Sequence, residues 1–343
     1  MADFPNDPRL DVRVKMALAV LNLGKPATFA SRDEMVAAAA SPENQVAVEQ
    51  FRAFMAMCNT EEVAPTDTIT ERHEKIVSQP DGNTINLQIF RPKGDETVAC
   101  VYYIHGGGMT NLSCYDGNYT AWGKILAAKG VAVVMVDFRN AVAPSSVPEV
   151  APFPAGLNDC LSGLRWVHEH AADLNIDPAR VVVAGESGGG NLTLAVGLSL
   201  KKSGDLGLVS GFYAFCPYIA GSWPREDLPS SVENNGILLD LHSPNGAMGY
   251  GQEAFDRRDP LAWPLFATVD DVKGWPRTVI SVNECDPLRD EGVAFYRLLL
   301  QAEVPARCRT VMGTMHGTEL FPILCPEITH DGARHLADFA RGA

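Results

Sequence analysis

The 343-residue sequence lacks the signals that mark several large classes of protein. No apolar run reaches the roughly 18 residues that a membrane-spanning helix requires. The start of the chain, Met1 to Asp7, has neither the basic nor the apolar region of a secretory signal. The eight cysteines are scattered singly, so the Cys-x-x-Cys spacing of zinc sites is absent. We therefore expect a cytoplasmic protein with free thiols, no membrane span, no metal and no cofactor.

Positive charge is also scarce. Lysine and arginine total 28 against 42 aspartates and glutamates, so the formal net charge is −14. This balance argues against nucleic acid or an anionic membrane surface as a partner. Neither glycine cluster, at 106–108 or 185–190, has the G-x-G-x-x-G spacing of a dinucleotide-binding loop. Hydrophobic residues make up 46% of the chain, which is ordinary for a globular protein with a sizeable core.

Hydrophobic periodicity predicts an α/β protein with a doubly wound, mostly parallel sheet. Residues 1–60 show helical spacing without a strand, and a Pro-, Gly-, Ser- and Asn-rich stretch at 217–262 interrupts the βα alternation. The core would then comprise residues 61–216 and 263–343. Strands are expected near 74–77, 85–90, 100–104, 131–137, 181–185, 208–215, 278–283 and 306–312, and core helices near 118–129, 157–172, 191–200, 291–302 and 329–341.

The segment Gly185-Glu186-Ser187-Gly188-Gly189 follows an expected strand and opens an expected helix. A G-x-S-x-G turn in that setting holds the serine in a strained, exposed geometry, and the small neighbours let the chain pass close to adjacent segments. Ser187 is therefore the candidate nucleophile.

A serine nucleophile needs a base within hydrogen-bond reach and a carboxylate that orients the base. The candidate base is His316, which follows the last strand and precedes a glycine. The candidate acid is Asp286, directly after the strand that ends near Asn283, although it could serve only as a helix N-cap. Glu284 and Asp290 are the alternative acids. Serine, acid and histidine in that chain order are typical of one widespread class of hydrolase sheets.

The run His105-Gly106-Gly107-Gly108 follows the strand that ends at Ile104. Glycines allow the backbone to approach a substrate closely, and backbone N–H groups aimed at one point stabilise a developing oxyanion. The N–H of the residue after the nucleophile, Gly188, is a further candidate donor. We expect His105 to hold the loop by hydrogen bonds and not to take part in the chemistry.

Taken in order, these four motifs make the chain similar to the hormone-sensitive lipase family (family IV) of α/β-hydrolase esterases. Asp137-Phe138-Arg139 and Phe153-Pro154-Ala155 resemble two further segments of that family. Tyr102-Tyr103-Ile104, Pro144 to Pro148 and Val232 to Gly236 resemble the bacterial brefeldin A esterase-like subgroup. The similarity covers roughly residues 70–340.

The resemblance implies an α/β-hydrolase fold with a helical cap formed by residues 1–60 and 217–262. It implies a serine carboxylesterase that hydrolyses short- to medium-chain esters, and allows lactones, through an acyl-enzyme. Ser187, Asp286 and His316 would be catalytic, and Gly106, Gly107, Gly108 and Gly188 would form the oxyanion hole. His105 and Glu186 would support the motifs. It also allows a homodimer.

Three positions depart from the family pattern. The family more often has Asp or Thr at 186 and Ala at 188, and it has Leu where this chain has Asn140. Two other functions remain open: a catalytically silent small-molecule-binding protein on the same fold, and an amidase. Met109, Phe212, Tyr213, Tyr218 and Trp223 could line an apolar substrate pocket or could belong to the ordinary core.

Overall fold

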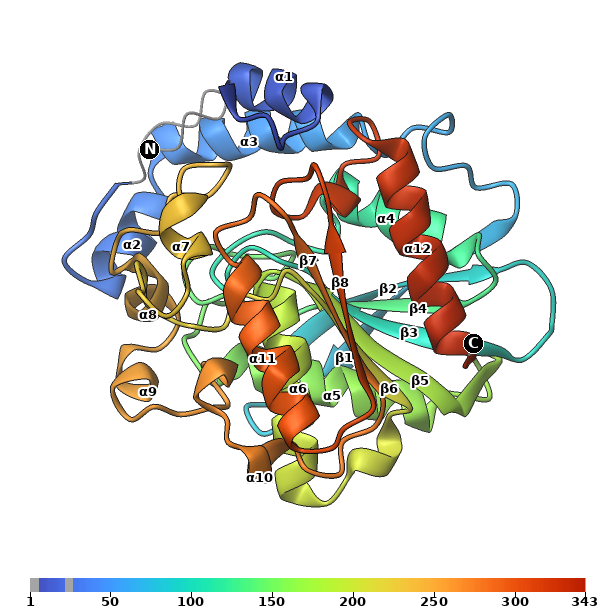
Figure 1. The fold of residues 1–343 in the computed structure, drawn as a ribbon. Coiled ribbons are helices and arrows are strands. Elements are labelled where there is room, and N and C mark those ends of the chain that lie inside the picture. Colours follow the sequence, from blue (N-terminus) through green and yellow to red (C-terminus); the bar gives the residue numbers. More distant parts are fainter. Residues whose placement is uncertain (1–5, 22–26, 343) are drawn as a thin grey trace.

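An eight-stranded sheet forms the centre of the molecule in the computed structural model, which describes residues 6–21 and 27–342 (Figure 1). The strand order is β1-β2-β4-β3-β5-β6-β7-β8. Strand β2 is antiparallel to both of its neighbours, and the strands from β4 to β8 are mutually parallel. The strands are β1 (Ile69–Val77), β2 (Thr84–Pro92), β3 (Val98–Ile104), β4 (Ala132–Asp137), β5 (Ile176–Glu186), β6 (Gly211–Phe215), β7 (Thr278–Asn283) and β8 (Ala306–Val311).

Helices cover both faces of the sheet, because alternate side chains of each parallel strand point to opposite sides and both sides are apolar. Helices α5 (Ala155–Glu169), α6 (Gly188–Ser203) and α11 (Arg289–Gln301) pack on one face. Helices α4 (Gly117–Ala127) and α12 (Pro326–Arg341) pack on the other. The expected α/β-hydrolase architecture is thereby confirmed.

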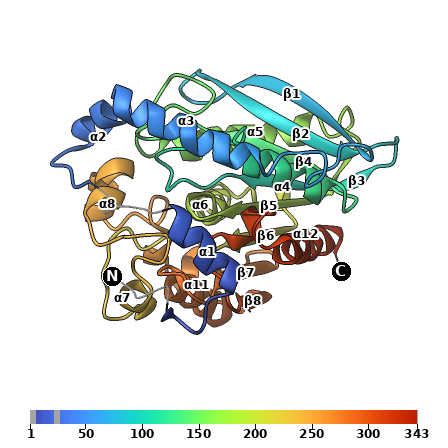
Figure 2. The same cartoon turned by 90° about the horizontal axis from the view of Figure 1, so that it is seen from above.

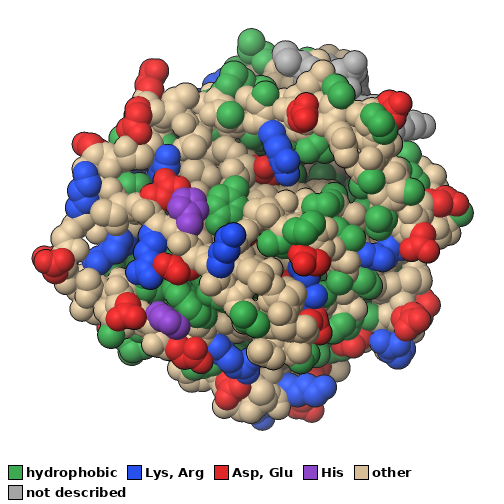
Figure 3. Space-filling view, turned by 180° about the vertical axis from the view of Figure 1, so that it is seen from behind, with side chains coloured by type: hydrophobic (Ala, Val, Ile, Leu, Met, Phe, Trp, Pro, Cys, Tyr) green, Lys and Arg blue, Asp and Glu red, His purple; other side chains and the backbone are tan. Residues whose placement is uncertain are grey.

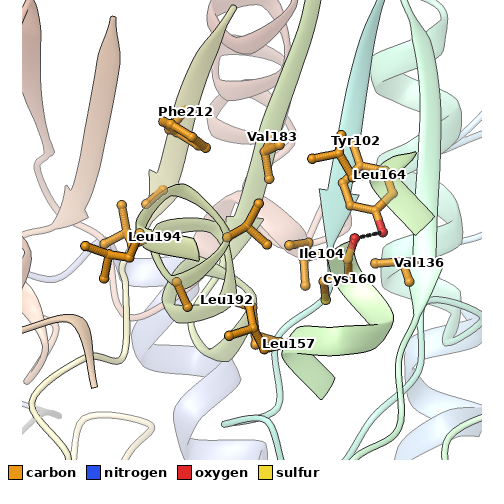
Figure 4. Close-up of a cluster of buried hydrophobic side chains, with 14 of the residues drawn as sticks. Tyr102, Ile104, Val136, Leu157, Cys160, Leu164, Val183, Leu192, Leu194 and Phe212 are labelled. Atoms are coloured by element: carbon orange, nitrogen blue, oxygen red, sulfur yellow. Dashed lines mark hydrogen bonds between the residues drawn. The ribbon is translucent and has the colours of Figure 1, made fainter. Parts of the chain in front are cut away.

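The core on the α5 and α6 face is shown in Figure 4. Ile104 and Val183 point from neighbouring strands toward Leu157 of α5 and Leu192 of α6. The hydroxyl of Tyr102 is buried in this layer and donates a hydrogen bond of 2.8 Å to the carbonyl of Cys160. The buried hydroxyl of Tyr102 therefore has a hydrogen-bond partner, as most buried polar groups do.

Three N-terminal helices precede the sheet: α1 (Val12–Leu21), α2 (Arg32–Ala39) and α3 (Pro42–Ala56). Figures 1 and 2 show them together along one end of the molecule, near the short helices α7 (Ser230–Glu233) and α8 (Asn245–Tyr250). Side-chain contacts join the two groups, since Arg9 pairs with Glu233 and Asn245 Nδ2 donates to the carbonyl of Ala27 at 2.7 Å. These two parts of the chain, far apart in sequence, thus form one layer.

The expected elements are found at nearly the expected positions, and several extend further than expected. Strand β5 begins at Ile176 and α6 at Gly188, each several residues before the predicted start. The 217–262 stretch contains α7, α8 and α9 (Gln252–Asp256) and, as expected, no strand. Shorter elements complete the chain: α10 (Val269–Val272) and the 3₁₀ turns Leu206–Leu208, Pro264–Phe266 and Thr318–Leu320.

The surface is mixed in character. On the face opposite to that of Figure 1, acidic and basic side chains are interspersed with apolar ones, so the net negative charge does not collect in one patch there (Figure 3). Within residues 6–21 and 27–342, no helix combines the length and the apolar character needed to span a bilayer.

Candidate active site

Ser187 stands at the turn between β5 and α6. Its φ of 58° and ψ of −117° lie in a region of backbone conformation that residues other than glycine rarely adopt. The Ser187 N–H donates to the carbonyl of Phe215 at 3.0 Å, and its carbonyl accepts from the N–H of Tyr218 at 3.1 Å. The backbone of Ser187 is therefore strained, as the motif predicts. Its hydrogen bonds to Phe215, the last residue of β6, and to Tyr218 hold it in this conformation.

Glycine is required on both sides of this turn. A Cβ at Gly185 would lie 2.4 Å from the carbonyl oxygen of Gly189, and a Cβ at Gly189 would lie 2.0 Å from that of Ile104. Real Cβ atoms do not approach backbone so closely. The glycines thus let α6 start directly against the end of β3, which brings Ser187 to the carboxyl edge of the parallel strands, where sites open on such sheets.

His316 and Asp286 are in direct contact. His316 Nδ1 lies 2.8 Å from Asp286 Oδ2, and both side chains are buried. The other carboxylate oxygen, Oδ1, accepts the N–H of Leu288 at 2.9 Å. Asp286 therefore stabilises the turn before α11 and also contacts the imidazole, so it is more than a helix cap.

The alternative acids point elsewhere. Glu284 accepts the N–H of Gly313 at 2.8 Å, and Asp290 accepts the N–H of Ser230 at 2.7 Å and pairs with Arg289. Among the described residues, neither Glu284 nor Asp290 makes a hydrogen bond or an ion pair with His316.

Ser187 and His316 face one pocket of about 430 Å³. Both are nearly buried, with exposed fractions of 7% and 5%. In this conformation of the described chain, no hydrogen bond joins the hydroxyl to the imidazole. Catalytic hydrogen bonds are often long in unliganded enzymes and shorten when substrate binds, so this geometry is compatible with a Ser–His pair.

The charge of Asp286 sets the protonation of His316. Burial disfavours the imidazolium, but the negative charge of Asp286, its hydrogen bond and the contact with Cys216 together outweigh burial and raise the pKa of His316 well above 6.5. The loop that carries His316 is itself anchored, because the Gly317 N–H donates to Asn283 Oδ1 at 3.3 Å.

The glycine loop after β3 approaches the nucleophile. Gly107 and Gly108 have φ of 90° and 59°, and a Cβ at Gly107 would lie 2.1 Å from the carbonyl oxygen of Asn111. A Cβ at Gly188 would lie 2.7 Å from the amide nitrogen of Gly108 and 2.6 Å from that of Met109. The start of α6 and the glycine loop therefore meet beside Ser187.

Gly106 differs from its neighbours. Its N–H donates to the hydroxyl of Tyr119 at 2.9 Å, and that hydroxyl donates to Glu186 Oε2 at 2.8 Å. The N–H groups of Gly107, Gly108 and Gly188 donate no hydrogen bond to any other described residue. The Gly106 donor is therefore already engaged in this structure, and the N–H groups of Gly107, Gly108 and Gly188 are the candidate oxyanion donors without a partner among the described residues.

His105 contacts the glycine loop directly after the end of β3. The ring is fully buried, stacks on Phe138 with centroids 4.3 Å apart, and contacts the carbonyl of Gly106 at 3.0 Å through Nδ1. Its Nε2 lies 3.5 Å from Asp137 Oδ1. Burial lowers the pKa of His105, so the ring is neutral at physiological pH.

Two residues at this site were not anticipated from the sequence. Tyr119 lies within α4 and connects Glu186 to the glycine loop. Cys216, directly after β6, contacts the His316 ring and is fully buried. Its place at the carboxyl end of a parallel strand was the one available signal, and a lone cysteine there is not distinctive.

The pocket wall is largely apolar. Of the aromatic and methionine side chains considered from the sequence, Tyr218 lines this pocket, while Met109, Phe212, Tyr213 and Trp223 do not and are buried. Phe51 of α3, Leu238, Leu239 and Phe321 also line it. The N-terminal helices and the 217–262 stretch therefore both contribute to the wall.

Comparison with known proteins agrees with this geometry. The family model described as alpha/beta hydrolase fold matches residues 101–320. Carboxylesterase NlhH of Mycobacterium tuberculosis is 30% identical, over 97% of this chain and 96% of its own. The ethyl acetate hydrolase of Pseudomonas putida is 31% identical, over 69% of this chain and 72% of its own.

Solved structures are similar over nearly the whole length. Esterase Est22 is 57% identical, with a TM-score of 0.96, over 99% of this chain and 100% of that one. Brefeldin A esterase, described as a bacterial homologue of human hormone-sensitive lipase, is 36% identical with a TM-score of 0.88, over 98% of this chain and 94% of its own. The chain therefore belongs to the hormone-sensitive lipase-like family of α/β-hydrolase esterases and is a carboxylic ester hydrolase.

Proposed function

We propose that the protein is a serine carboxylesterase in which Ser187, His316 and Asp286 act as nucleophile, base and orienting acid. The observation that carries the proposal is the 2.8 Å contact between His316 and Asp286 in the same pocket as a serine at a strained turn. A buried carboxylate on Nδ1 favours the tautomer whose Nε2 can accept a proton.

The reaction would proceed in two steps. His316 takes the proton of Ser187 as the hydroxyl attacks the ester carbonyl, and the oxyanion forms against the N–H groups of Gly107, Gly108 and Gly188. His316 then protonates the leaving alcohol, and water repeats the sequence on the acyl-enzyme. Asp286 stabilises the imidazolium that forms in each step.

The substrate would be an ester with a short- to medium-length acyl chain. The pocket of about 430 Å³ falls near the lower end of the range of roughly 300–1,000 Å³ typical of small-molecule sites. It is lined mainly by apolar side chains, and Tyr218 and Phe51 narrow it. Lactones of similar size would fit the same chemistry, since they contain the same ester carbonyl.

The test is a Ser187→Ala variant assayed on p-nitrophenyl acetate. Turnover should fall by about 10⁴–10⁶-fold, because the base has no hydroxyl to activate. Circular dichroism should be unchanged, and Ser203→Ala, on the far end of α6, should keep full turnover. Wild-type-like turnover in the Ser187→Ala variant would exclude the mechanism.

A fluorophosphonate probe distinguishes an esterase from a silent binding protein. Wild-type enzyme should be labelled at Ser187, because such probes react with activated serines. Amide substrates of matched acyl length should be turned over far more slowly than esters.

A further inference from the structure

Glu186, Cys216 and His316 bring three metal-ligating atoms together beneath the candidate catalytic pocket. One carboxylate oxygen, the Cys216 sulfur and an imidazole nitrogen all lie within 4.8 Å of one another, and all three side chains are buried. The three residues come from the end of β5, the residue after β6 and the loop after β8. The sequence shows no metal-ligand spacing because these positions are far apart in the chain.

The distances suit a tetrahedral cation. Zn²⁺ binds imidazole nitrogen and carboxylate oxygen at about 2.0–2.2 Å. At a tetrahedral angle, two such ligand atoms lie about 3.4 Å apart. His316 Nε2 and Glu186 Oε1 are separated by 3.4 Å. Little movement of either side chain would therefore be needed to bind the ion between them.

The surrounding hydrogen bonds also resemble those of metal sites. A ligating histidine almost always donates its other ring N–H to a carboxylate or carbonyl, which fixes the ring and leaves the free nitrogen to bind the metal. His316 Nδ1 contacts Asp286, so Nε2, which faces Glu186 Oε1, is the nitrogen left to bind a metal. Glu186 is held in the same way, because its other oxygen accepts the Tyr119 hydroxyl.

We propose that this cluster is an inhibitory site for a borderline-soft divalent cation such as Zn²⁺, ligated by His316 Nε2, Glu186 Oε1 and Cys216 Sγ. The cation would enter through the substrate pocket, which Glu186 and His316 line. Binding releases to solvent the thiol proton of Cys216 and the Nε2 proton of the imidazolium form of His316, and thiolate and carboxylate together neutralise the double positive charge, as burial requires. A fourth position is left for water.

Occupation of the site removes the candidate base. The nitrogen that would accept the proton of Ser187 is then bonded to the cation, so ester hydrolysis stops until a chelator removes the ion. Thiolate and imidazole favour Zn²⁺ over Mg²⁺ or Ca²⁺, which prefer oxygen ligands, so inhibition is selective. This consequence for activity rests on the proposed function, whereas binding of the cation does not.

The first experiment measures p-nitrophenyl acetate hydrolysis against Zn²⁺ concentration, with Mg²⁺ as the comparison ion and a chelator to restore activity. Each variant is compared with its own metal-free rate. The Zn²⁺ concentration for half-inhibition should rise at least about tenfold in Cys216→Ala, since even the loss of an outer contact typically costs 10–100-fold in affinity. Cys216→Ser is the second variant if the first does not fold.

The matched control is Cys325→Ala. Cys325 also lies beside two carboxylates, those of Asp11 and Glu327, and that cluster is partly exposed. Its loss should leave Zn²⁺ inhibition unchanged. Equal inhibition of wild-type and Cys216 variants, or no inhibition of wild-type enzyme by Zn²⁺, would overturn the proposal.

The second experiment does not depend on turnover. Co²⁺ is added to Ser187→Ala protein, which keeps all three ligands, and thiolate-to-cobalt charge-transfer absorption is recorded. The band should reach its maximum at one Co²⁺ per protein molecule. It should be absent from the double variant that carries both Ser187→Ala and Cys216→Ala. Absence of the band from Ser187→Ala alone would contradict the site even if the esterase mechanism is correct, and its presence would support the site even if that mechanism is not.

Discussion

Strain at Ser187 is held by hydrogen bonds from several segments. A positive φ at a residue other than glycine raises the free energy of the folded state by on the order of 1–3 kcal/mol. Here the Ser187 N–H and carbonyl are bonded to Phe215 and Tyr218, and its carbonyl also accepts the N–H of Asn191 at 2.9 Å. The Asn191 side chain in turn donates to the carbonyls of Tyr218 and Ala262. The turn therefore keeps its geometry without help from a substrate.

The raised pKa of His316 makes a prediction at the same scale. A general base must be neutral, so activity falls as pH drops through the pKa of the imidazole. The acid limb of kcat/KM should therefore lie above pH 6.5, the ordinary histidine value. In Asp286→Asn the limb should move to lower pH, because the negative charge that raises the pKa is gone, and kcat should drop by roughly 10⁴-fold.

Asp290→Asn is the control for this profile. Asp290 is bonded to Ser230 and Arg289, so its loss should leave the acid limb where it is. An acid limb at the same pH in wild-type and Asp286→Asn enzyme would contradict the assignment.

The raised pKa of His316 also affects stability. The contribution of the Asp286–His316 pair to the free energy of unfolding is complete below pH 6.5 and is lost as pH rises through the raised pKa.

At the scale of elements, the junction of β5, α6 and the glycine loop leaves no room for a side chain at position 188. The family pattern commonly has alanine there, yet a Cβ at Gly188 would lie 2.7 Å from the amide nitrogen of Gly108. Gly188→Ala should push the loop away from the nucleophile. Because the loss of one oxyanion donor costs about 10²–10³ in kcat, a fall of that order is expected in ester hydrolysis.

Gly207→Ala provides a comparison for Gly188→Ala. No atom lies within 4 Å of a Cβ built at Gly207, in the turn before β6. This variant should retain wild-type kcat. Unchanged kcat in Gly188→Ala would mean that the loop adjusts at no cost and that the close approach is unimportant.

A second element-scale prediction concerns the segment after β6. The buried carboxylate of Glu291, on α11, accepts the N–H groups of Ile219 at 2.6 Å and Ala220 at 3.2 Å, and Trp223 Nε1 at 2.7 Å. Glu291→Ala leaves these buried donors unpaired. The free energy of unfolding measured in denaturant should fall by about 2–5 kcal/mol, since each unpaired buried group costs about 1–3 kcal/mol.

The control for Glu291 is Glu253→Ala on α9. The Glu253 side chain is 92% exposed, so its removal should change the free energy of unfolding by less than about 0.5 kcal/mol. Similar stability of Glu291→Ala and wild-type protein would show that water replaces the carboxylate at no cost.

At the scale of the whole molecule, helix α3 of the N-terminal segment contributes Phe51 to the wall of the candidate catalytic pocket. A second apolar cavity of about 480 Å³ lies between α2, α3 and the sheet domain. The two cavities share Phe51, Asn111 and Leu112 as wall residues. Phe51 comes from the N-terminal layer and the other two follow the glycine loop, so the wall between the cavities is formed by distant parts of the chain.

Phe51→Ala should therefore join the two spaces. We expect the ratio of kcat/KM for p-nitrophenyl octanoate over p-nitrophenyl acetate to rise severalfold, because the longer chain gains apolar surface to bury at about 0.8 kcal/mol per CH₂. Val46→Ala on the same helix should leave the ratio unchanged, since Val46 is 53% exposed. An unaltered ratio in Phe51→Ala would show that the second cavity does not receive the substrate.

Much of this arrangement could be predicted from local patterns. The turn at Ser187, the position of His316 after the last strand and that of Asp286 after β7 depend on short runs of sequence next to apolar strands. Chain order and the parallel sheet then bring them to one edge. The hydrogen bond made by the Gly106 N–H could not be predicted, because its partner, the Tyr119 hydroxyl, lies on a helix whose orientation depends on tertiary packing. The cluster proposed to bind a cation could not be predicted either, because Glu186, Cys216 and His316 are far apart in the chain.

The sequence by itself determined the βα alternation, the strained serine turn and the choice of candidate catalytic side chains, because each follows from residues adjacent in the chain. Only the tertiary structure decided which donors are free, which carboxylate contacts the imidazole, and that Glu186 and Cys216 surround His316. These contacts join segments that are up to 130 residues apart in the chain, as Glu186 and His316 are. Such contacts form because the sheet buries its two faces, and local conformational preferences do not determine them.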